Sequence, residues 1–449
     1  FYPSGSASAV LTEIFPKLKS KTFSFAKLRG SIARVGNDAG FDRLINSYSY
    51  GGLFRNDMAW FQGDAVRKNP NLKPETTISK EIGAEVRLLD GRLTADVTYY
   101  DKYTRDQIVE SELSYLSNYQ RVIINSGKIS NKGWEISVSG VPVKVKNFEW
   151  KTIFNWSKNN SMVESLPEGI DKIQIGSGVY NVKSYAEVGK PYGAIYAKTF
   201  KRDAEGYILC QLDGSPKEGQ DYEYLGCVQA DWRGGWNNVF RLGNFSFSVM
   251  FDFQKGGKFF SQTSIQSSVD GQSVKSLEGR DADFFSRKIL GESDEERYGF
   301  MRPQNANTPT ANGQIYPDWG RPKGVVLPNC RYDEDVEGLA GQQVLGYCTP
   351  ERYWMHYTSR DISRFIYDAS YVKLREITVS YDLPKKWLRK TPFQTFRVAA
   401  VGRNIATLFA NTPHGLDPQA TSTTGNAQGF ERGFNLPSAT YGFDIKVSF

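Results

Sequence analysis

Hydrophobic and polar residues alternate most regularly at the very end of the chain. In the last nine residues every odd position, from Tyr441 to Phe449, carries an aromatic or β-branched side chain, and every even position a small or charged one. Because a β-strand sends successive side chains to opposite faces of its sheet, this segment predicts a strand with one apolar and one polar face. A transmembrane β-barrel, with lipid outside and water inside, requires this pattern.

Three hairpins earlier in the chain show the same alternation. Turn signals at 90–91, 146–147 and 243–244 each precede an alternating segment. The predicted strands are 93–100 with its partner 82–88, 148–157 and 245–254, and further strands are predicted at 23–35, 371–381 and 396–403. In the strongest of them five large residues share one face and are predicted to face lipid: Phe245, Phe247, Val249, Phe251 and Phe253.

Long polar stretches without periodicity lie between the hairpins, at about 201–231, 261–314, 321–359 and 411–438. Short turns at one end and long loops at the other are typical of outer-membrane barrels, whose long loops face the cell exterior. We therefore expect an all-β fold, the wall of a transmembrane antiparallel β-barrel, with about 12 to 14 strands in this chain. Aromatic residues near the strand ends fit either interfacial girdles or ordinary sheet packing.

Composition agrees with this interpretation and removes several others. The 449 residues are 39% hydrophobic, 14% aromatic and 23% charged, which excludes a disordered chain. The sequence has no stretch approaching roughly 18 consecutive apolar residues, so a membrane-spanning helix is not predicted. The net charge of +7 comes from 56 basic and 49 acidic residues scattered along the chain. Nucleic acid is therefore not an expected partner.

The cysteines and histidines suggest structural rather than catalytic roles. Cys210 with Cys227 and Cys330 with Cys348 form two local pairs in polar sequence. They predict two loop disulfides, each worth about 3 kcal/mol in the chain-entropy model, and an oxidising compartment; four unpaired thiols are the alternative. The two histidines, at 356 and 414, lack the spacing of a zinc motif, so no metal site is expected.

Two segments are candidates for ligand contact. Trp232 and Trp236 flank Arg233, and indole rings beside a guanidinium group suit a sugar face or a peptide; the alternative is an interfacial girdle. The acidic run at 333–337 offers oxygen ligands for calcium, but it lacks the EF-hand pattern, and such a run is more often a solvated loop. No catalytic motif is found, so the sequence does not predict an enzyme, although triads assemble in space rather than in sequence.

Several motifs occur in the order of a known family. The segment 69–76 reads NPNLKPET and precedes TYYDKYTRDQI at 98–108. The others are LRGS at 28–31, NSG at 125–127 with NKGWE at 131–135, VGKPYG at 188–193, DASYVKLREI at 368–377, GRN at 402–404, LDP at 416–418 and the terminal Phe449. Together, over almost the whole chain, they resemble the SusC/RagA family of TonB-dependent outer-membrane transporters.

The resemblance implies that residues 1–449 form the C-terminal part of a barrel of about 22 strands, with the plug and TonB box outside this chain. The last strand is then expected to pair with a first strand that this sequence does not contain. Members of the family import oligomeric nutrients, glycans or peptides, without a cofactor. Their partners are a SusD-like lipoprotein lid, the TonB complex, a second transporter–lipoprotein pair, and the lipid and lipopolysaccharide of the outer membrane. Phe449 would be the signal for barrel assembly. A passive porin or an adhesin-type barrel is the alternative function.

Overall fold

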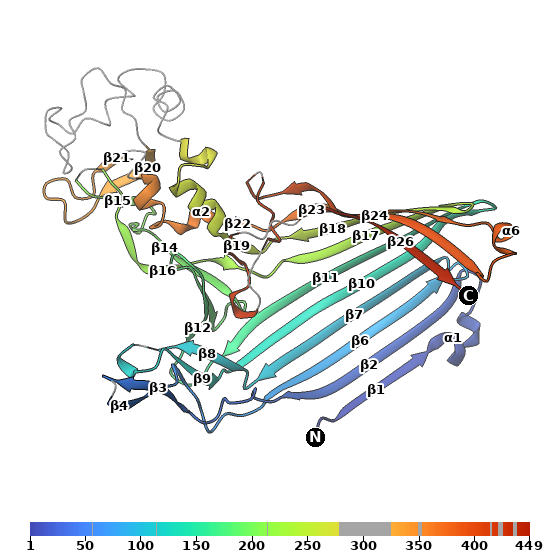
Figure 1. The fold of residues 1–449 in the computed structure, drawn as a ribbon, viewed down its shortest axis with the longest axis horizontal. Helices are drawn as coiled ribbons and strands as arrows, with labels where there is room; N and C mark the ends of the chain where they lie inside the picture. Colours follow the sequence, from blue (N-terminus) through green and yellow to red (C-terminus); the bar gives the residue numbers. More distant parts are fainter. Residues whose placement is uncertain are drawn as a thin grey trace, which may run out of the picture.

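Eleven long strands form one curved antiparallel sheet in the computed structural model (Figure 1). The structure describes residues 1–55, 57–113, 115–212, 214–277, 325–348, 353–413, 415–420, 425–433 and 438–449. The order of the strands in the sheet is their order in the chain, so the sheet is an up-and-down meander with β1 and β26 at its edges. The strands are β1 (Ser4–Val10), β2 (Phe23–Asn37), β6 (Glu75–Leu88), β7 (Leu93–Arg105), β10 (Lys128–Val145), β11 (Phe148–Ser165), β17 (Trp232–Leu242), β18 (Phe245–Lys255), β23 (Tyr371–Asp382), β24 (Thr395–Ala410) and β26 (Thr440–Ser448).

Every strand predicted from alternation lies in this sheet. Two of the three predicted two-residue turns are confirmed, because Val145 pairs with Phe148 across residues 146–147, and Leu242 pairs with Phe245 across 243–244. The turn signal at 90–91 lies instead in a four-residue connection, since Leu88 pairs with Leu93. The sheet holds eleven strands rather than the expected 12 to 14. The remaining strands of the chain are short and form separate sheets within the loops.

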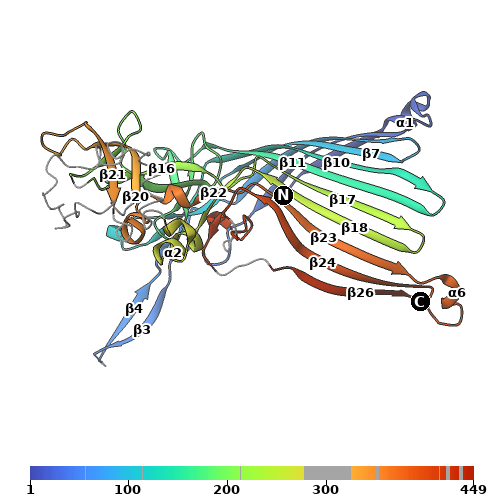
Figure 2. The ribbon, with the colours of Figure 1, turned by 90° about the horizontal axis from the view of Figure 1, so that it is seen from above.

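The two ends of the sheet differ in the length of their connections (Figure 2). At one end, two connections are only residues 146–147 and 243–244, and the longest are 11–22 and 383–394. These longer two hold the helices α1 (Leu11–Ile14), η1 (Pro16–Leu18) and α6 (Lys385–Leu388). At the other end the connections are 38–74, 106–127, 166–231, 256–370 and 411–439. This asymmetry in connection length is the predicted one.

The long connections fold into a separate layer, which the sequence did not predict. Its strands form five small sheets: β12 (Lys172–Ser177), β13 (Lys183–Glu187), β14 (Ala194–Phe200) and β16 (Glu218–Cys227); β15 (Ile208–Cys210), β20 (Val325–Tyr332) and β21 (Gln343–Cys348); β22 (Ile366–Asp368), β19 (Lys258–Ser261) and β25 (Phe430–Glu431); β5 (Val66–Arg67), β9 (Arg121–Asn125) and β8 (Ile108–Glu112); and the hairpin β3 (Tyr48–Phe54) with β4 (Met58–Gly63). Its helices are η2 (Tyr115–Ser117), α2 (Gln262–Val269), η3 (Val274–Leu277), η4 (Tyr353–Tyr357), η5 (Ile362–Phe365) and η6 (Gly425–Ala427).

The main hydrophobic core lies in this loop layer rather than in the large sheet. Side chains from several connections meet there and are fully buried, including Ile195, Phe200, Phe260, Trp354, Phe365 and Phe430. Burial of large aromatic side chains is the main term that can hold such a layer together. No helix among the described residues is long and apolar enough to cross a membrane.

Candidate functional site

The strand registers divide the large sheet into two chemically different faces. Ser246 and Ser248 of β18 share one face, which we call the inner face, with Val239 and Arg241 of β17. The opposite, outer face carries Phe245 and Phe247, which are 57% and 39% exposed. A polar face and an exposed apolar face on the same strands are what a membrane-spanning wall requires.

Polar groups on the outer face are satisfied by neighbouring side chains. The Trp150 Nε1–H donates to Asn238 Oδ1 at 3.0 Å, and the Trp236 Nε1–H donates to Thr152 Oγ1 at 2.8 Å. Unsatisfied polar groups are costly in lipid, so these indole donors let the amide and hydroxyl face outward. Aromatic rings pack across the strands around them, with the Trp150 and Phe240 ring centroids 5.8 Å apart.

An arginine lies flat along the inner face near the first strands. Both terminal nitrogens of Arg29 donate to the Asp96 carboxylate at 2.6 Å, and one also donates to Thr98 Oγ1 at 2.5 Å. To reach them, the side chain crosses the intervening strand at Gly83, where a Cβ would lie 2.7 Å from Arg29 Nε. Because Gly83 has no side chain, Arg29 can reach across its strand and form a bidentate ion pair with Asp96.

A tyrosine crosses the inner face in the same way two strands further on. The Tyr100 hydroxyl donates to Asn159 Oδ1 at 3.1 Å, passing over Gly133 of β10. A Cβ at Gly133 would lie 2.4 Å from the Tyr100 hydroxyl and 2.3 Å from the Lys158 carbonyl. Arg29 and Tyr100 thus both run along the wall to partners on other strands instead of projecting from it.

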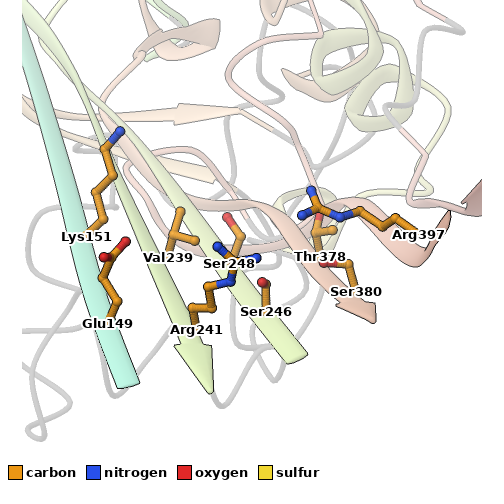
Figure 3. Close-up of a pocket in the computed structure, with 9 residues that line it drawn as sticks. All are labelled: Glu149, Lys151, Val239, Arg241, Ser246, Ser248, Thr378, Ser380 and Arg397. Atoms are coloured by element: carbon orange, nitrogen blue, oxygen red, sulfur yellow. The ribbon is translucent and has the colours of Figure 1, made fainter. Parts of the chain in front are cut away.

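A cavity of about 360 Å³ opens on the inner face near the short-turn end (Figure 3). Its lining is Glu149, Lys151, Val239, Arg241, Ser246, Ser248, Thr378, Ser380 and Arg397. Arg397 donates to the Asp382 carboxylate at 2.6 and 2.9 Å, and Arg241 also contacts it at 3.3 Å. The cavity is therefore polar, with basic side chains in excess of acidic ones.

A second charged network lies on the sheet where β23 approaches the loop layer. The Lys373 ammonium donates to Asp417 Oδ1 and Oδ2 at 2.5 and 2.6 Å and to Gln419 Oε1 at 3.0 Å. Arg375 donates to the same Gln419 oxygen at 2.7 Å and also pairs with Asp252 of β18. The connection between β24 and β26 is therefore held against the barrel wall by two cations.

The four-stranded loop sheet carries a cluster of tyrosines and lysines on one face. The Lys172 ammonium lies 3.2 Å from the Tyr196 ring centroid and 4.2 Å from that of Tyr185. The Lys190 ammonium donates to the Tyr196 hydroxyl at 2.7 Å. Burial raises the pKa of Tyr185 to about 12. Tyr196 is only 3% exposed and Glu187 pairs with both lysines, so these groups satisfy one another and stabilise the loop sheet.

The candidate contacts Trp232, Arg233 and Trp236 lie on different faces of the sheet. Trp236 packs against Phe251 on the outer face, with ring centroids 5.9 Å apart, and Trp232 shares its face by register. Arg233 points to the other face, where its Nε donates to Gln254 Oε1 at 3.0 Å. The three do not form one cluster, and the tryptophans are placed as the alternative, an interfacial girdle, requires.

The five residues predicted to face lipid lie on the outer face of β18, as the register with β17 shows. Phe449 packs on Phe393 with ring centroids 5.3 Å apart, beside the edge strand β26. In β26, Tyr441, Phe443 and Ile445 are 76%, 86% and 63% exposed. The alternating pattern of the last strand therefore corresponds to an exposed apolar face.

The disulfide pairing expected from the sequence is wrong. Cys227 carries a free thiol, whose Sγ donates to the Tyr192 carbonyl at 3.6 Å, so it has no bond to Cys210. On the hairpin of β20 and β21, Cys330 pairs with Val344 while Cys348 pairs with Val325. Five residues along a strand separate these two levels by roughly 16 Å, and bridged cysteines need Cα atoms within about 7 Å. Spacing in the sequence did not predict the pairing correctly, because the strand register determines which residues lie opposite each cysteine.

The acidic run at 333–337 is an ion-pair cluster in the loop layer. The Lys201 and Lys217 ammonium groups each donate to Asp333 Oδ2 at 2.8 Å, and the Asp333 side chain is only 4% exposed. Burial alone would raise the pKa of Asp333, but these hydrogen bonds outweigh it and lower the pKa to about 2. Among the described residues no three histidine, cysteine or acidic side chains form a possible metal site. His356 is exposed, and His414 lies outside the described residues.

Comparison with known sequences places these features in a family. The sequence model described as "TonB dependent receptor-like, beta-barrel" matches residues 4–411. TonB-dependent receptor P3 of Formosa agariphila is 25% identical over 98% of this chain and 40% of its own length. The TonB-dependent receptor SusC of Bacteroides thetaiotaomicron is 29% identical over 23% of this chain and 10% of its own length. The chain thus spans less than half of the relatives it matches.

Solved structures show the same fold. The RagAB peptide transporter superposes over the whole of this chain with a TM-score of 0.67, at 17% identity and covering 43% of that chain. Its closed-closed state gives the same TM-score. Together with the polar inner and apolar outer faces, these matches confirm the resemblance and an outer-membrane location in a Gram-negative bacterium. The chain belongs to the β-barrel family of TonB-dependent receptors.

Proposed function

We propose that the protein imports oligomeric nutrients, glycans or peptides, across the outer membrane in a TonB-dependent manner. The observation that carries this proposal is the construction of the inner face. Arg29 and Tyr100 lie flat across Gly83 and Gly133, so charged and polar groups form a continuous lining bonded along the wall, as the wall of a passage for polar molecules requires. A wall meant only for anchoring would need no such polar lining.

The folded loop layer supports recognition of a specific substrate. A passive pore needs little structure outside the membrane, whereas this layer has its own core and several sheets. The side chains of this layer, such as Tyr185 beside Lys172, are of types that contact both glycans and peptides. Both substrate classes thus stay within the proposal, and the similar RagAB structure is that of a peptide transporter.

The proposed partners follow from the family. A SusD-like surface lipoprotein would close over the loop layer, the TonB complex would supply energy through the rest of the protein, and two transporter–lipoprotein pairs would form a dimer. The similarity to SusC and to the RagAB structure supports the lipoprotein and the TonB complex as partners. Pull-down of the affinity-tagged full-length transporter from outer membranes, followed by mass spectrometry, should recover the lipoprotein at equal stoichiometry.

Uptake measurements test the function. Cells that express the full-length protein should accumulate labelled oligosaccharides or oligopeptides, and deletion of tonB should abolish that accumulation. Accumulation that persists without TonB would support a passive porin instead. Surface binding without uptake in either strain would support an adhesin. Mass spectrometry of small molecules that copurify with the transporter then separates glycan from peptide substrates.

A further inference from the structure

On β6, β7, β10 and β11 the outer face carries no charged residue from the short turns to near the loop layer. Registers join outer-face positions across the sheet, so that Val86, Ala95, Val138 and Phe154 lie side by side on four successive strands. The outer-face residues at the short-turn ends of these strands are likewise uncharged: Leu88, Leu93, Val143, Val145, Phe148 and Trp150. This belt fixes the depth of the sheet in the membrane.

Positive charge occurs on the outer face at the opposite end of the belt. Lys80 and Lys132 are at one level, both paired with Asp101 of the strand between them. Lys158 of the next strand is opposite Trp134, which is two residues nearer the short turns than Lys132. Arg34 is opposite Ile78, which is two residues nearer the loop layer than Lys80. We call Arg34, Lys80, Lys132 and Lys158 the outer basic collar.

The collar is exposed and mostly unpaired. All four of its side chains belong to exposed residues. Lys132 lies 3.4 Å from Asp101, but within the part of the chain that the structure describes Arg34, Lys80 and Lys158 have no carboxylate within ion-pair distance. Tyr99 and Trp134, with ring centroids 4.9 Å apart, lie just below Lys80 and Lys132. Cations beside interfacial aromatic rings lie at the level of lipid headgroups.

We propose that the outer basic collar binds the phosphate groups of phosphorylated lipids in the outer leaflet. Adjacent strands are about 4.8 Å apart, so the backbones of Lys80 and Lys132 are roughly 10 Å apart and Lys158 is within reach of both. One headgroup with two phosphates can therefore contact several of the lysines. Lysine binds phosphate as a point charge, and in the part of the chain that the structure describes the ammonium groups of Lys80 and Lys158 are not held by a carboxylate, whereas Lys132 lies 3.4 Å from Asp101.

The test uses the purified full-length transporter and diphosphorylated lipid A in detergent micelles. Bound lipid is counted by native mass spectrometry, and the shift in melting temperature is followed against lipid concentration. The triple variant Lys80→Gln, Lys132→Gln and Lys158→Gln should bind at least about tenfold more weakly than the wild type. The matched control removes three exposed lysines near the short turns, Lys146→Gln, Lys385→Gln and Lys386→Gln, and should bind like the wild type.

A second comparison needs no variant. Wild-type protein should bind diphosphorylated lipid A at least about tenfold more tightly than the same lipid stripped of its phosphates. Equal affinity for both lipids, or undiminished binding by the collar variant, would overturn the proposal. Equal weakening in the control variant would do so as well, because the effect would then follow net charge rather than the collar.

Discussion

Lys373 of the barrel wall and Asp417 of the last long connection form a nearly buried ion pair, with N–O distances of 2.5 and 2.6 Å. Their side chains are 6% and 16% exposed. The two residues belong to two of the motifs shared with the SusC/RagA family, the run at 368–377 and the LDP at 416–418. The pair therefore joins these two segments, which are distant in the sequence.

Removing one partner of this pair should loosen the connection between β24 and β26. Asp417→Asn leaves the Lys373 ammonium buried without a counter-charge, which typically costs about 3–5 kcal/mol. We expect faster proteolysis within 411–439 and a lower melting temperature. The control is Arg403→Gln, which breaks the exposed pair with Glu376 and should cost less than about 1 kcal/mol. Equal protease sensitivity of both variants would contradict the anchoring role.

Replacing a glycine that a side chain crosses should destabilise the protein much more than replacing another strand glycine. Gly133→Ala places a Cβ against the Lys158 carbonyl and the Tyr100 hydroxyl, and crowding of this kind costs about 1–3 kcal/mol. Gly442→Ala in β26 meets nothing within 4 Å and should be neutral or slightly stabilising. The melting temperatures of the two variants in detergent compare them directly, and a loss for Gly442→Ala as large as for Gly133→Ala would refute the explanation.

The Asp333 cluster predicts how the loop layer responds to acid. Because the pKa of Asp333 is lowered from 3.8 to about 2, the stabilising effect of the cluster is complete above about pH 5 and is lost as the pH falls toward 2. The shift corresponds to about 2 kcal/mol. The protection factors of residues 201–217, which are exchange rates corrected for the pH dependence of intrinsic exchange, should therefore fall between pH 5 and pH 3 in the wild type. In Asp333→Asn, protection should already be low at pH 5 and depend less on pH.

Alternation predicted the barrel wall well, because lipid on one side and water on the other act on every residue of a strand. The segment at 245–254 needed no tertiary information to be placed, and its outer face follows from its own sequence. The loop layer gave no such signal. In β14 six of the seven residues are buried, so the strand does not alternate, and the side chains that share its core, such as Phe260, Trp354 and Phe430, come from other connections.

Local sequence also misled where chemistry depends on register. Cys330 and Cys348 are close in the sequence but lie at different levels of one hairpin. Trp232 and Arg233 are adjacent in the sequence and for that reason point to opposite faces of their strand. The crossings of Gly83 by Arg29 and of Gly133 by Tyr100 required pairing across three strands, which no single-strand pattern contains.

The most direct test of the central claim compares two neighbouring residues of β18 in the full-length protein. Val249 is on the outer face between Asn238 and Ile377, whereas Ser248 lines the inner cavity. Val249→Arg should block assembly or destabilise the folded barrel by about 2–4 kcal/mol in lipid, while Ser248→Arg should fold like the wild type. The folded fraction in bilayers, read from heat-modifiable mobility on gels, measures both. Equal tolerance of the two arginines would contradict a wall with lipid on one side and water on the other.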